Sequence, residues 1–417
     1  MLFHFASDLF RMLAFCMIAS IFTALLLRLA TKAAHPSRRY DFQPKVSVLL
    51  PVYNEGAGVS NTIDSIFSAD WPESKLEIVA IDDCSKDDSY AHLERSRHRY
   101  GDRIKIGRNS VNSGKHVTQV KASHQASGDV FICIDSDCIF DKDAIRQLTA
   151  CLWDARVGAV GGSVGVRNVN DNLLTMAQAV FYFRSFQFMK TFQYIQKNVS
   201  CISGCLFAIR AQLYRELERE IHDNNFLGAR IRNGEDRYLT HLVALRGLRT
   251  VINPNAICWT SVPNKFWVLF SQQLRWSRSG YKDLLWTLST LGRNFRIVGV
   301  VRTMAWLNPL LIGLLVLIFT ILSVPMFGPG AFVRAMGFGM FSSVILSFFN
   351  VLLYSWLAPR LMPGSKRLDH PLLFVFCGLW GPVVLVLHFV ALLTLDIGAW
   401  GTRETPSVTQ KQPSTSA

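Results

Sequence analysis

Long apolar runs near both ends of the chain constrain its fold more than any other feature of the sequence. Residues 12–27 carry no charged side chain, and three longer apolar runs cover about 299–324, 333–357 and 371–395. Each of these three runs exceeds the roughly 20 residues that a helix needs to cross a bilayer. The sequence therefore predicts a membrane protein whose remaining residues form a domain outside the bilayer.

Basic residues set the expected orientation of the first apolar run. Arg28, Lys32, Arg38 and Arg39 follow it, whereas a signal peptide has its basic residues before the apolar stretch and a cleavage site after it. Residues 1–40 are therefore predicted to be an uncleaved anchor whose C-terminal side faces the cytosol. The next domain is then expected to be the cytosolic part of a multi-pass plasma-membrane protein.

Short apolar strands alternate with helices from residue 41 to residue 260. The strands and helices are predicted at residues 46–50, 59–69, 76–81, 116–126 and 130–134. This rhythm predicts an α/β fold with a mostly parallel sheet, in which ligands gather beyond the carboxyl ends of the strands.

Charge and cysteine content narrow the classes of partner. The net charge of +14 suits nucleic acid, anionic lipid head groups or a phosphorylated substrate. The sequence has no helix-turn-helix, RNA-binding or zinc-finger signature, so no nucleic-acid partner is expected. The nine cysteines show neither disulfide nor zinc spacing, which favours a reducing, cytosolic environment.

Two carboxylates separated by one residue follow the predicted strand 130–134. Asp135 and Asp137 lie at the strand end, where both side chains can reach one ligand. Carboxylate oxygens suit Mg²⁺ or Mn²⁺, and two acids after a buried strand would cost stability unless a partner balanced their charge. A divalent-metal site is therefore favoured over a solvated turn.

Two other strand ends carry groups that could hold a nucleotide. Tyr53 and Glu55 end the first strand, where an aromatic ring can stack on a base and polar groups can hold a ribose. Asp82 and Asp83 end the second strand, where a carboxylate can accept hydrogen bonds from uracil or ribose. A plain turn and a helix N-cap explain these two motifs equally well.

Two further motifs suggest catalysis and binding close to the membrane. Glu235 and Asp236 precede an apolar helix, where a carboxylate could draw a proton from an acceptor hydroxyl, although acids also favour helix N-termini in general. Gln272, Arg275 and Trp276 share one helical face. Arginine suits a phosphate and tryptophan a sugar ring, but an interfacial helix also carries both residue types for lipid contact alone.

Together these motifs resemble the inverting family-2 glycosyltransferases that make and secrete polysaccharides, namely hyaluronan, chitin and cellulose synthases. The resemblance covers about residues 44–280, and the Gln-Gln-Leu-Arg-Trp segment at 272–276 is its most specific part. It implies a GT-A fold, UDP-sugar donors, a divalent metal (Mg²⁺ or Mn²⁺), a growing polysaccharide and a surrounding lipid bilayer.

The resemblance also implies a role for each matched residue. Asp236, with Glu235 beside it, would act as the general base, and Asp137 would bind the metal. The implied nucleotide-sugar contacts are Tyr53, Glu55, Asp82 or Asp83, Lys115, Asp135, Gln272, Arg275 and Arg403. The implied acceptor contacts are Trp276, Ser203, Gly204 and Cys205.

Three details bear on the polymer. The segment at 203–206 is similar to the acceptor segment of hyaluronan and nodulation-type chitin synthases, which usually have proline in place of Cys205. The Trp-Gly-Thr-Arg segment at 400–403 matches hyaluronan synthases, whereas Glu235 is more typical of chitin synthases. A processive synthase of an N-acetylglucosamine-containing, hyaluronan-like polymer is predicted, with chitin, chitooligosaccharides or another capsular β-glycan as alternatives. A transporter with an accessory domain fits the acidic motifs poorly.

The membrane topology contains a conflict. Beyond the cytosolic domain we predict interfacial helices at 261–298, a transmembrane region at 299–397 and a tail at 398–417. Four spans from an outside N-terminus would leave the tail outside, although the resemblance places Arg403 at the cytosolic site. The run 371–395, interrupted by Gly378, Gly381 and Pro382, is therefore expected to be bent or re-entrant.

Overall fold

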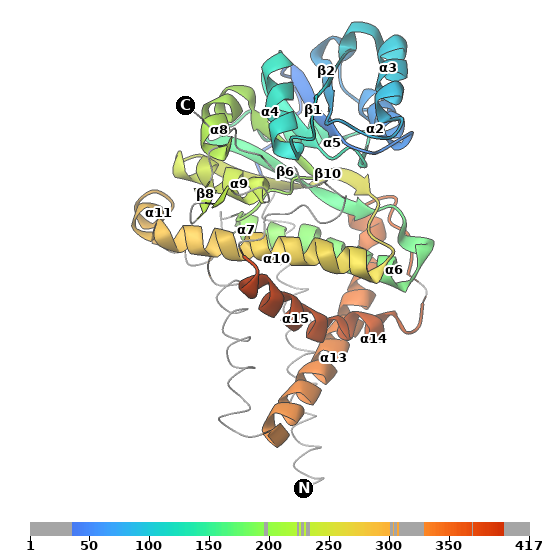
Figure 1. The fold of residues 1–417 in the computed structure, drawn as a ribbon, viewed down its shortest axis with the longest axis vertical. Coiled ribbons are helices and arrows are strands. Elements are labelled where there is room, and N and C mark those ends of the chain that lie inside the picture. Colours follow the sequence, from blue (N-terminus) through green and yellow to red (C-terminus); the bar gives the residue numbers. More distant parts are fainter. Residues whose placement is uncertain are drawn as a thin grey trace, which may run out of the picture.

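The computed structural model describes residues 36–195, 199–222, 225–226, 229–230, 234–300, 303, 307, 329–368 and 370–395. An α/β domain occupies one end of the molecule, and long helices extend from its other end (Figure 1). The predicted N-terminal anchor, nearly all of the run 299–324 and the tail with Arg403 lie outside the described residues.

A single mixed sheet forms the centre of the domain. In spatial order its eight strands are β3 (Ile104–Arg108), β2 (Leu76–Asp82), β1 (Val46–Val52), β4 (Val130–Ile134), β7 (Leu206–Arg210), β6 (Val157–Val166), β10 (Arg249–Thr260) and β5 (Ile139–Phe140). β7 runs antiparallel to both its neighbours, β5 runs antiparallel to β10, and the other pairs are parallel. The predicted α/β fold with a mostly parallel sheet is confirmed.

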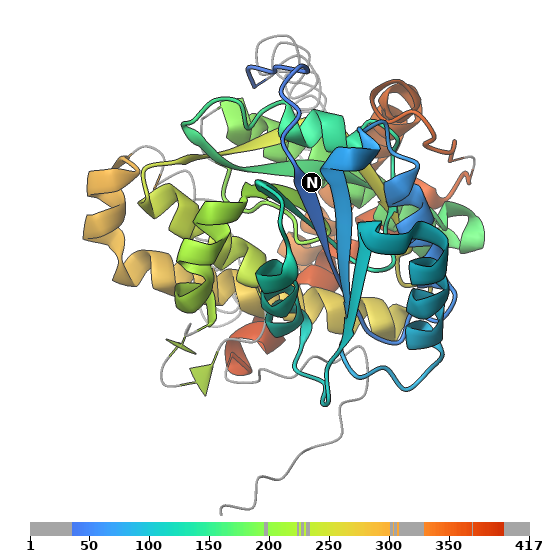
Figure 2. The ribbon, with the colours of Figure 1, turned by 90° about the horizontal axis from the view of Figure 1, so that it is seen from above.

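Helices cover both faces of this sheet (Figure 2). They are α2 (Gly58–Phe67), α3 (Ser89–Tyr100) and α5 (Ala144–Thr149) on one face, and α4 (Lys115–Gln125), α8 (Ala211–His222) and α9 (Glu235–Leu245) on the other. Val48 and Leu50 of β1 join the first core, whereas Leu49 joins the second. The central strands are mostly apolar because both of their faces are buried.

Short elements complete the domain. They are the 3₁₀ turns η1 (Glu73–Lys75), η2 (Gly101–Arg103) and η3 (Val169–Asp171), the hairpin β8 (Asn225–Phe226) with β9 (Ala229–Arg230), the helices α6 (Leu173–Phe183) and α7 (Lys190–Ile195), and the π-helix η4 (Arg184–Met189) that joins them.

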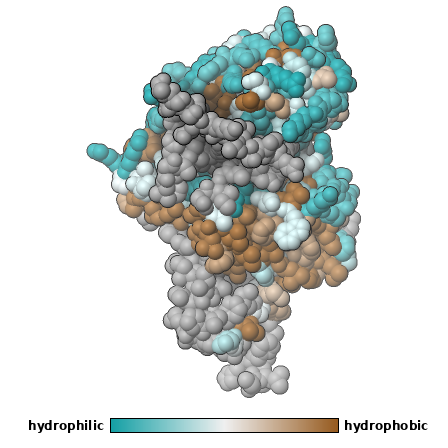
Figure 3. Space-filling view, in the orientation of Figure 1, coloured by the Kyte–Doolittle hydropathy of each residue, from teal (hydrophilic) through white to brown (hydrophobic). Residues whose placement is uncertain are grey.

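The helix α10 (Phe266–Ser289) crosses beneath the domain and leads into α11 (Leu291–Ile297) (Figure 1). It exposes large apolar side chains at both ends, including Phe266, Trp267, Val268, Leu285 and Leu288. A band of hydrophobic surface lies at this level, below the hydrophilic surface of the α/β domain (Figure 3). An exposed apolar band of this kind is typical of a helix that lies in a membrane interface.

Two described segments are long and apolar enough to cross a membrane, Gly339–Leu361 and Leu373–Leu393. The first belongs to α13 (Pro329–Leu361), and most of its surface is exposed. The second is interrupted at Leu379, which separates α14 (Leu373–Gly378) from α15 (Trp380–Leu393) within the run that was expected to be bent or re-entrant.

The second segment packs against both α13 and α10. A Cβ atom at Gly378 would lie 2.5 Å from Cα of Val344, so glycine allows α14 to pack closely on α13. The hydroxyl of Tyr281 on α10 lies 2.8 Å from Nδ1 of His388 on α15. α15 therefore runs along the underside of the interfacial helix and supports it from below (Figure 1).

Candidate active site

A chain of polar contacts begins where β4 ends and β7 starts. The Lys115 ammonium, at the first residue of α4, pairs with the carboxylate of Asp135 and donates to the carbonyl oxygen of Gly204 at 3.1 Å. Because β7 runs antiparallel to β4, Gly204 at its start lies beside Asp135 at the end of β4. Lys115 therefore joins the predicted donor and acceptor segments.

The charges of this contact region depend on one another. Burial lowers the pKa of Lys115, but the charges of Asp135 and Glu235 outweigh this and raise it above its ordinary range. Burial also raises the pKa of Glu235, and the nearby Lys115 ammonium opposes that rise. Lys115 therefore remains a cation between two carboxylates.

Asp137 is largely buried, and few neighbouring groups neutralise the charge of its carboxylate. Its carboxylate accepts a hydrogen bond from the Thr260 hydroxyl at 3.2 Å, at the end of β10, and lies 3.6 Å from the Cys138 sulfur. Burial raises the pKa of Asp137 to about 6, and the charges of Asp135 and Glu55 add to this rise. A cation bound here would reduce the electrostatic repulsion between these neighbouring carboxylates.

The donor atoms at this point suit a divalent ion. One ligand atom from each of Asp135, Asp137 and Cys138 lies within 4.8 Å of the others. Glu55 reaches the same region, since its carboxylate accepts from the Ser136 hydroxyl at 3.0 Å. Carboxylate oxygens are the ligands that Mg²⁺ and Mn²⁺ prefer, so the residues present fit such a metal.

The end of β1 is tied to the end of β2. The Asn54 amide donates to the Ser85 hydroxyl at 2.9 Å, and the Glu55 amide donates to the Ser89 hydroxyl at 2.8 Å. Asn54 has a φ of 53°, which turns the chain sharply after the strand. The loop that carries Tyr53 and Glu55 is thereby held against the loop that follows Asp82.

The two acids that end β2 already hold protein groups. Asp82 is fully buried and pairs with Arg108 at 3.0 Å. Asp83 accepts from the Asn109 side chain at 2.7 Å and from the backbone amides of Ser113 and Gly114 at 2.8 and 2.7 Å. Asp83 therefore fixes the loop that positions Lys115.

Asp236 lies in the first turn of α9 and is held by three donors. One carboxylate oxygen accepts from the Gly204 amide at 3.1 Å and from the Cys201 thiol at 3.6 Å, and the other accepts from the Arg237 amide at 2.9 Å. A Cβ atom at residue 204 would lie 3.4 Å from Nζ of Lys115 and 3.5 Å from the Asp236 carboxylate. The absence of a side chain at Gly204 thus leaves the space between these two groups open.

Helix α9 is fixed to the interfacial helix α10 and to α11. Tyr238 packs edge-on against Trp286 with ring centroids 4.9 Å apart, and His241 does the same at 4.0 Å. Burial lowers the pKa of His241 to about 4, so the ring is neutral and its Nε2–H donates to Asn294 at 2.8 Å. The position of Asp236 is therefore coupled to the seating of α10.

Gly234 allows the closest approach between these helices. Its φ is +89°, and a Cβ atom there would lie only 1.9 Å from the Ser279 hydroxyl of α10. Both the left-handed backbone and the contact with Ser279 require glycine.

We expect Gly234→Ala to lower any activity that depends on Asp236 about 100-fold, because the start of α9 must move away from α10 and carry Asp236 with it. Initial rates and the thermal unfolding midpoint measure the effect. The double variant Gly234→Ala, Ser279→Gly removes the clash but keeps the backbone strain, so it should recover part of the activity. Equal rates for the two variants would contradict a steric cause.

The Gln-Gln-Leu-Arg-Trp segment lies in α10 below the carboxylates. The Trp276 ring is 40% exposed and lies 6.4 Å from the ring of Tyr182. Burial raises the pKa of Tyr182, and the groups that add to the rise include Cys205 and Asp137. Tyr182 therefore contacts Trp276 and lies near Asp137 and Cys205.

Gln272 of the same segment has a buried side-chain oxygen that accepts no hydrogen bond from the described residues. A buried oxygen of this kind normally accepts a hydrogen bond, for example from a ligand or a water.

The structure brings Lys115, Asp135, Gly204 and Asp236 together through direct contacts, with Asp137 beside Asp135, whereas the contacts described above do not join Tyr53 or Arg275 to them.

A few residues that sequence reasoning missed lie in the same region. Lys190 of α7 lies near Asp236, and burial lowers the pKa of its ammonium. Cys201 and Tyr182 were missed as well, since each stands in an apolar or irregular segment without a motif. Arg403 cannot be placed because it lies outside the described residues.

The sequence of this chain is similar to those of several known proteins. A model of the family described as "Glycosyl transferase family 2" matches residues 47–218. An N-acetylglucosaminyltransferase of Azorhizobium caulinodans is 30% identical over 241 residues, which are 58% of this chain and 60% of that protein. A hyaluronan synthase of Streptococcus pyogenes serotype M1 is 27% identical over 397 residues, which are 92% of this chain and 89% of that protein.

A second N-acetylglucosaminyltransferase, from Rhizobium sp., is 31% identical over 66% of this chain. The chain spans 60% and 62% of the lengths of the two N-acetylglucosaminyltransferases. Among solved structures, the mannosyltransferase PcManGT of Pyrobaculum calidifontis superposes with a TM-score of 0.54 at 17% identity, covering 92% of this chain and 98% of that one. At this identity the likeness concerns the GT-A fold.

Proposed function

We propose that this chain is a membrane-embedded synthase that polymerises UDP-sugars processively, and the match of residues 47–218 to the glycosyl transferase family 2 model supports this. The observation that carries the proposal is the continuous set of contacts from Asp135 through Lys115 and Gly204 to Asp236. It joins a site suited to a metal and diphosphate to a carboxylate suited to a general base. The product is a secreted polysaccharide that contains N-acetylglucosamine.

The nucleotide-sugar lies across the carboxyl ends of β1, β2 and β4. Tyr53 stacks on the base, and the acids at the ends of β1 and β2, Glu55, Asp82 and Asp83, bind ribose and base or shape the loop around them. Lys115 and Asp135 hold the sugar end, and Gln272 and Arg275 approach the diphosphate from α10. The fork of an arginine matches the geometry of a diphosphate.

Asp135 and Asp137 would hold a divalent metal, Mg²⁺ or Mn²⁺, with Thr260 orienting the Asp137 carboxylate. Such an ion, when bound, neutralises the diphosphate and stabilises it as a leaving group. The raised pKa of Asp137, caused by burial and by Asp135 and Glu55, supports this assignment.

Asp236 acts on the acceptor. The amides of Gly204 and Arg237 fix its carboxylate at the edge of the space left open by Gly204. Asp236 takes the proton from an acceptor hydroxyl as the oxygen attacks the anomeric carbon and the bond to UDP breaks. Glu235, the preceding residue, adds a second negative charge next to Asp236, and the nearby Lys115 ammonium offsets the repulsion between the two carboxylates.

The acceptor chain lies on the membrane side of this site. Ser203, Gly204 and Cys205 border it from the start of β7, and the exposed Trp276 ring offers an apolar face for a sugar. The apolar band on α10 and the two long apolar segments support insertion in a lipid bilayer. We place the protein in the plasma membrane with the GT-A domain in the cytosol.

Which polymer the protein makes depends on which UDP-sugars it uses as donors. The hyaluronan synthase of Streptococcus pyogenes aligns with 92% of this chain, which favours a hyaluronan-like product. The Rhizobium N-acetylglucosaminyltransferase aligns at higher identity over 66% of it, which favours a polymer of N-acetylglucosamine alone as the second candidate.

Purified protein in lipid nanodiscs tests the proposal directly. We expect long polymer from UDP-GlcNAc together with UDP-GlcA and Mn²⁺, measured by radiolabel incorporation and gel filtration. Long polymer from UDP-GlcNAc alone would identify the second candidate. Absence of polymer under both conditions, with release of free UDP only, would contradict a polymerase.

A further inference from the structure

Three cysteine side chains gather beside the acids that follow β4. Cys138 lies in the turn after β4, Cys205 directly precedes β7, and Cys258 lies in β10 opposite Phe140. The Cys138 thiol shares hydrogen bonds with the thiols of the other two, and the Cys258 sulfur lies 3.9 Å from the carbonyl oxygen of Cys205. The fold therefore concentrates sulfur atoms at one point, although the three residues are far apart in the sequence.

The Cys138 sulfur lies next to the acids of the proposed metal site. The Cys138 amide donates to the Asp135 carbonyl oxygen at 3.1 Å, which closes a tight turn. One ligand atom from each of Asp135, Asp137 and Cys138 lies within 4.8 Å of the others, and the sulfur is 3.6 Å from an Asp137 carboxylate oxygen. Both acids are partly exposed, so an ion can reach this group from solvent. The group thus offers two oxygen ligands and one sulfur ligand.

The sulfur atom changes which ion this group suits. Mg²⁺ takes oxygen ligands, whereas Zn²⁺ binds carboxylate oxygen and thiolate sulfur together. In a tetrahedral zinc site, a Zn–S bond of about 2.3 Å and a Zn–O bond of about 2.1 Å place the two ligand atoms about 3.6 Å apart. The Cys138 sulfur and the Asp137 oxygen have this separation. Three protein ligands leave the fourth position of the zinc ion to a water.

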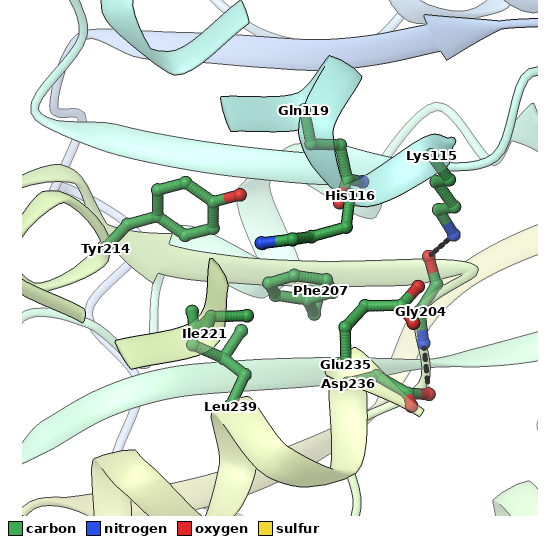
Figure 4. A pocket seen from close by; sticks show the side chains of 10 residues that line it. All are labelled: Lys115, His116, Gln119, Gly204, Phe207, Tyr214, Ile221, Glu235, Asp236 and Leu239. Atoms are coloured by element: carbon green, nitrogen blue, oxygen red, sulfur yellow. Dashed lines mark hydrogen bonds between the residues drawn. The ribbon is translucent and has the colours of Figure 1, made fainter. Parts of the chain in front are cut away.

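The thiols lie on the side of the sheet that α2, α3 and α5 cover. Cys138 and Cys258 belong to the core on that side, and Cys205 packs against it. The small pocket beside Lys115 and Asp236 opens on the opposite side, and no cysteine is among the residues that line it (Figure 4). An ion bound by Cys138 would therefore act on the metal-binding acids rather than on the general base.

We propose that Asp135, Asp137 and Cys138 form a binding site for Zn²⁺, and that zinc bound there blocks the metal-dependent binding of the donor. As the ion binds, a Zn–S bond replaces the S–H bond of Cys138 and the proton leaves to solvent, with no change of oxidation state. Cys205 and Cys258 can then donate their S–H groups to the Cys138 thiolate.

Zinc held in this way occupies Asp137, which we assign to the ion that neutralises the diphosphate. The inference rests on the proposed function for that assignment, whereas the binding of zinc itself requires no donor. Zinc binding and donor binding can therefore be measured separately.

Spectroscopy of the full-length protein without nucleotide tests the zinc site. Cd²⁺ stands in for zinc, because a Cd²⁺–thiolate bond has a charge-transfer band in the ultraviolet, and added Zn²⁺ should remove the band by competition. We expect this band in the wild type and its loss in Cys138→Ser. By calorimetric titration, the same variant should bind Zn²⁺ about 100-fold more weakly.

Cys151→Ser is the matched control. Cys151 is also fully buried, and its thiol donates to the carbonyl oxygen of Gln147 at 3.7 Å, in the segment that follows α5. The control should keep the wild-type band and zinc affinity. Cys138→Ala, which leaves no polar group in the core, is measured alongside and should also lack the band.

Serine at position 138 keeps a hydrogen-bond donor beside Asp137 but removes the sulfur. A Cys138→Ser protein with the wild-type zinc affinity would show that the thiol serves Asp137 as a hydrogen-bond donor alone, and the inference would be wrong. A wild-type protein without the Cd²⁺–thiolate band would overturn it as well.

Competition with the donor completes the test. Zn²⁺ should suppress UDP binding in Mn²⁺ at a concentration about 100-fold lower for the wild type than for Cys138→Ser. Equal concentrations for the two proteins would contradict a block through Cys138. A wild type that shows the Cd²⁺–thiolate band but binds UDP equally with and without Mn²⁺ would instead overturn the metal site of the proposed function.

Discussion

Replacing Asp236 with asparagine is expected to lower polymerisation about 1000-fold and to leave the affinity for UDP in Mn²⁺ nearly unchanged. The amide has the size of the carboxylate but cannot take a proton from the acceptor hydroxyl. It also presents an NH₂ group to one of the two backbone amides, of Gly204 or Arg237, that now donate to Asp236. The acceptor geometry is therefore disturbed as well as the chemistry.

Radiolabel incorporation measures the rate, and calorimetric titration measures UDP binding. Asp102→Asn is the matched control, since Asp102 is exposed in η2 at the far edge of the sheet and should leave both quantities unchanged. An Asp236→Asn protein that polymerises at near the wild-type rate would show that another group is the base.

Replacing Asp137 with alanine is expected to weaken UDP binding in Mn²⁺ at least about 100-fold, because a metal ligand that faces the diphosphate is lost. In the absence of metal, the wild-type and variant proteins should bind UDP equally weakly. The variant is also expected to fold well, since it removes a carboxylate whose pKa is raised to about 6 by burial and by neighbouring acids.

Titration of UDP with Mn²⁺ and with EDTA separates these two effects. Asp143→Ala, at the N-terminal end of α5, is the matched control and should retain metal-dependent binding. If Asp137→Ala bound UDP in Mn²⁺ as tightly as the wild type, the metal would have to be held elsewhere.

The centre of the fold could be predicted from the sequence because its strands carry an unambiguous signal. β1, β2 and β4 are mostly apolar, since helices bury both of their faces, and polar turn residues end each of them. The two antiparallel strands could not be predicted, because apolar runs such as Leu206–Arg210 do not reveal which way a strand enters the sheet.

The candidate site was predictable where its residues follow strands and less so where they do not. Asp135 and Asp137 stand at a strand end, which fixes their place once the strand is known. Tyr182 and Lys190 join the site through a π-helix between α6 and α7, and no pattern in the sequence marks such a turn.

Contacts between helices that are far apart in the chain could not be predicted from the sequence either. In the sequence, Gly234 is only one residue of a short acidic motif. Its closeness to Ser279 in the structure shows that the start of α9 meets α10 at this point. The same holds for α4 and α8, which lie about 90 residues apart along the chain and yet touch directly in the structure, where His124 of α4 lies 2.8 Å from Glu218 of α8.

The most direct test of one shared site is an electron cryomicroscopy structure of the Asp236→Asn protein in nanodiscs with UDP-GlcNAc and Mn²⁺. We predict the metal between Asp137 and the diphosphate, the sugar beside Lys115, and its anomeric carbon facing residue 236. A nucleotide bound away from Asp137, or a sugar that does not face residue 236, would contradict the account.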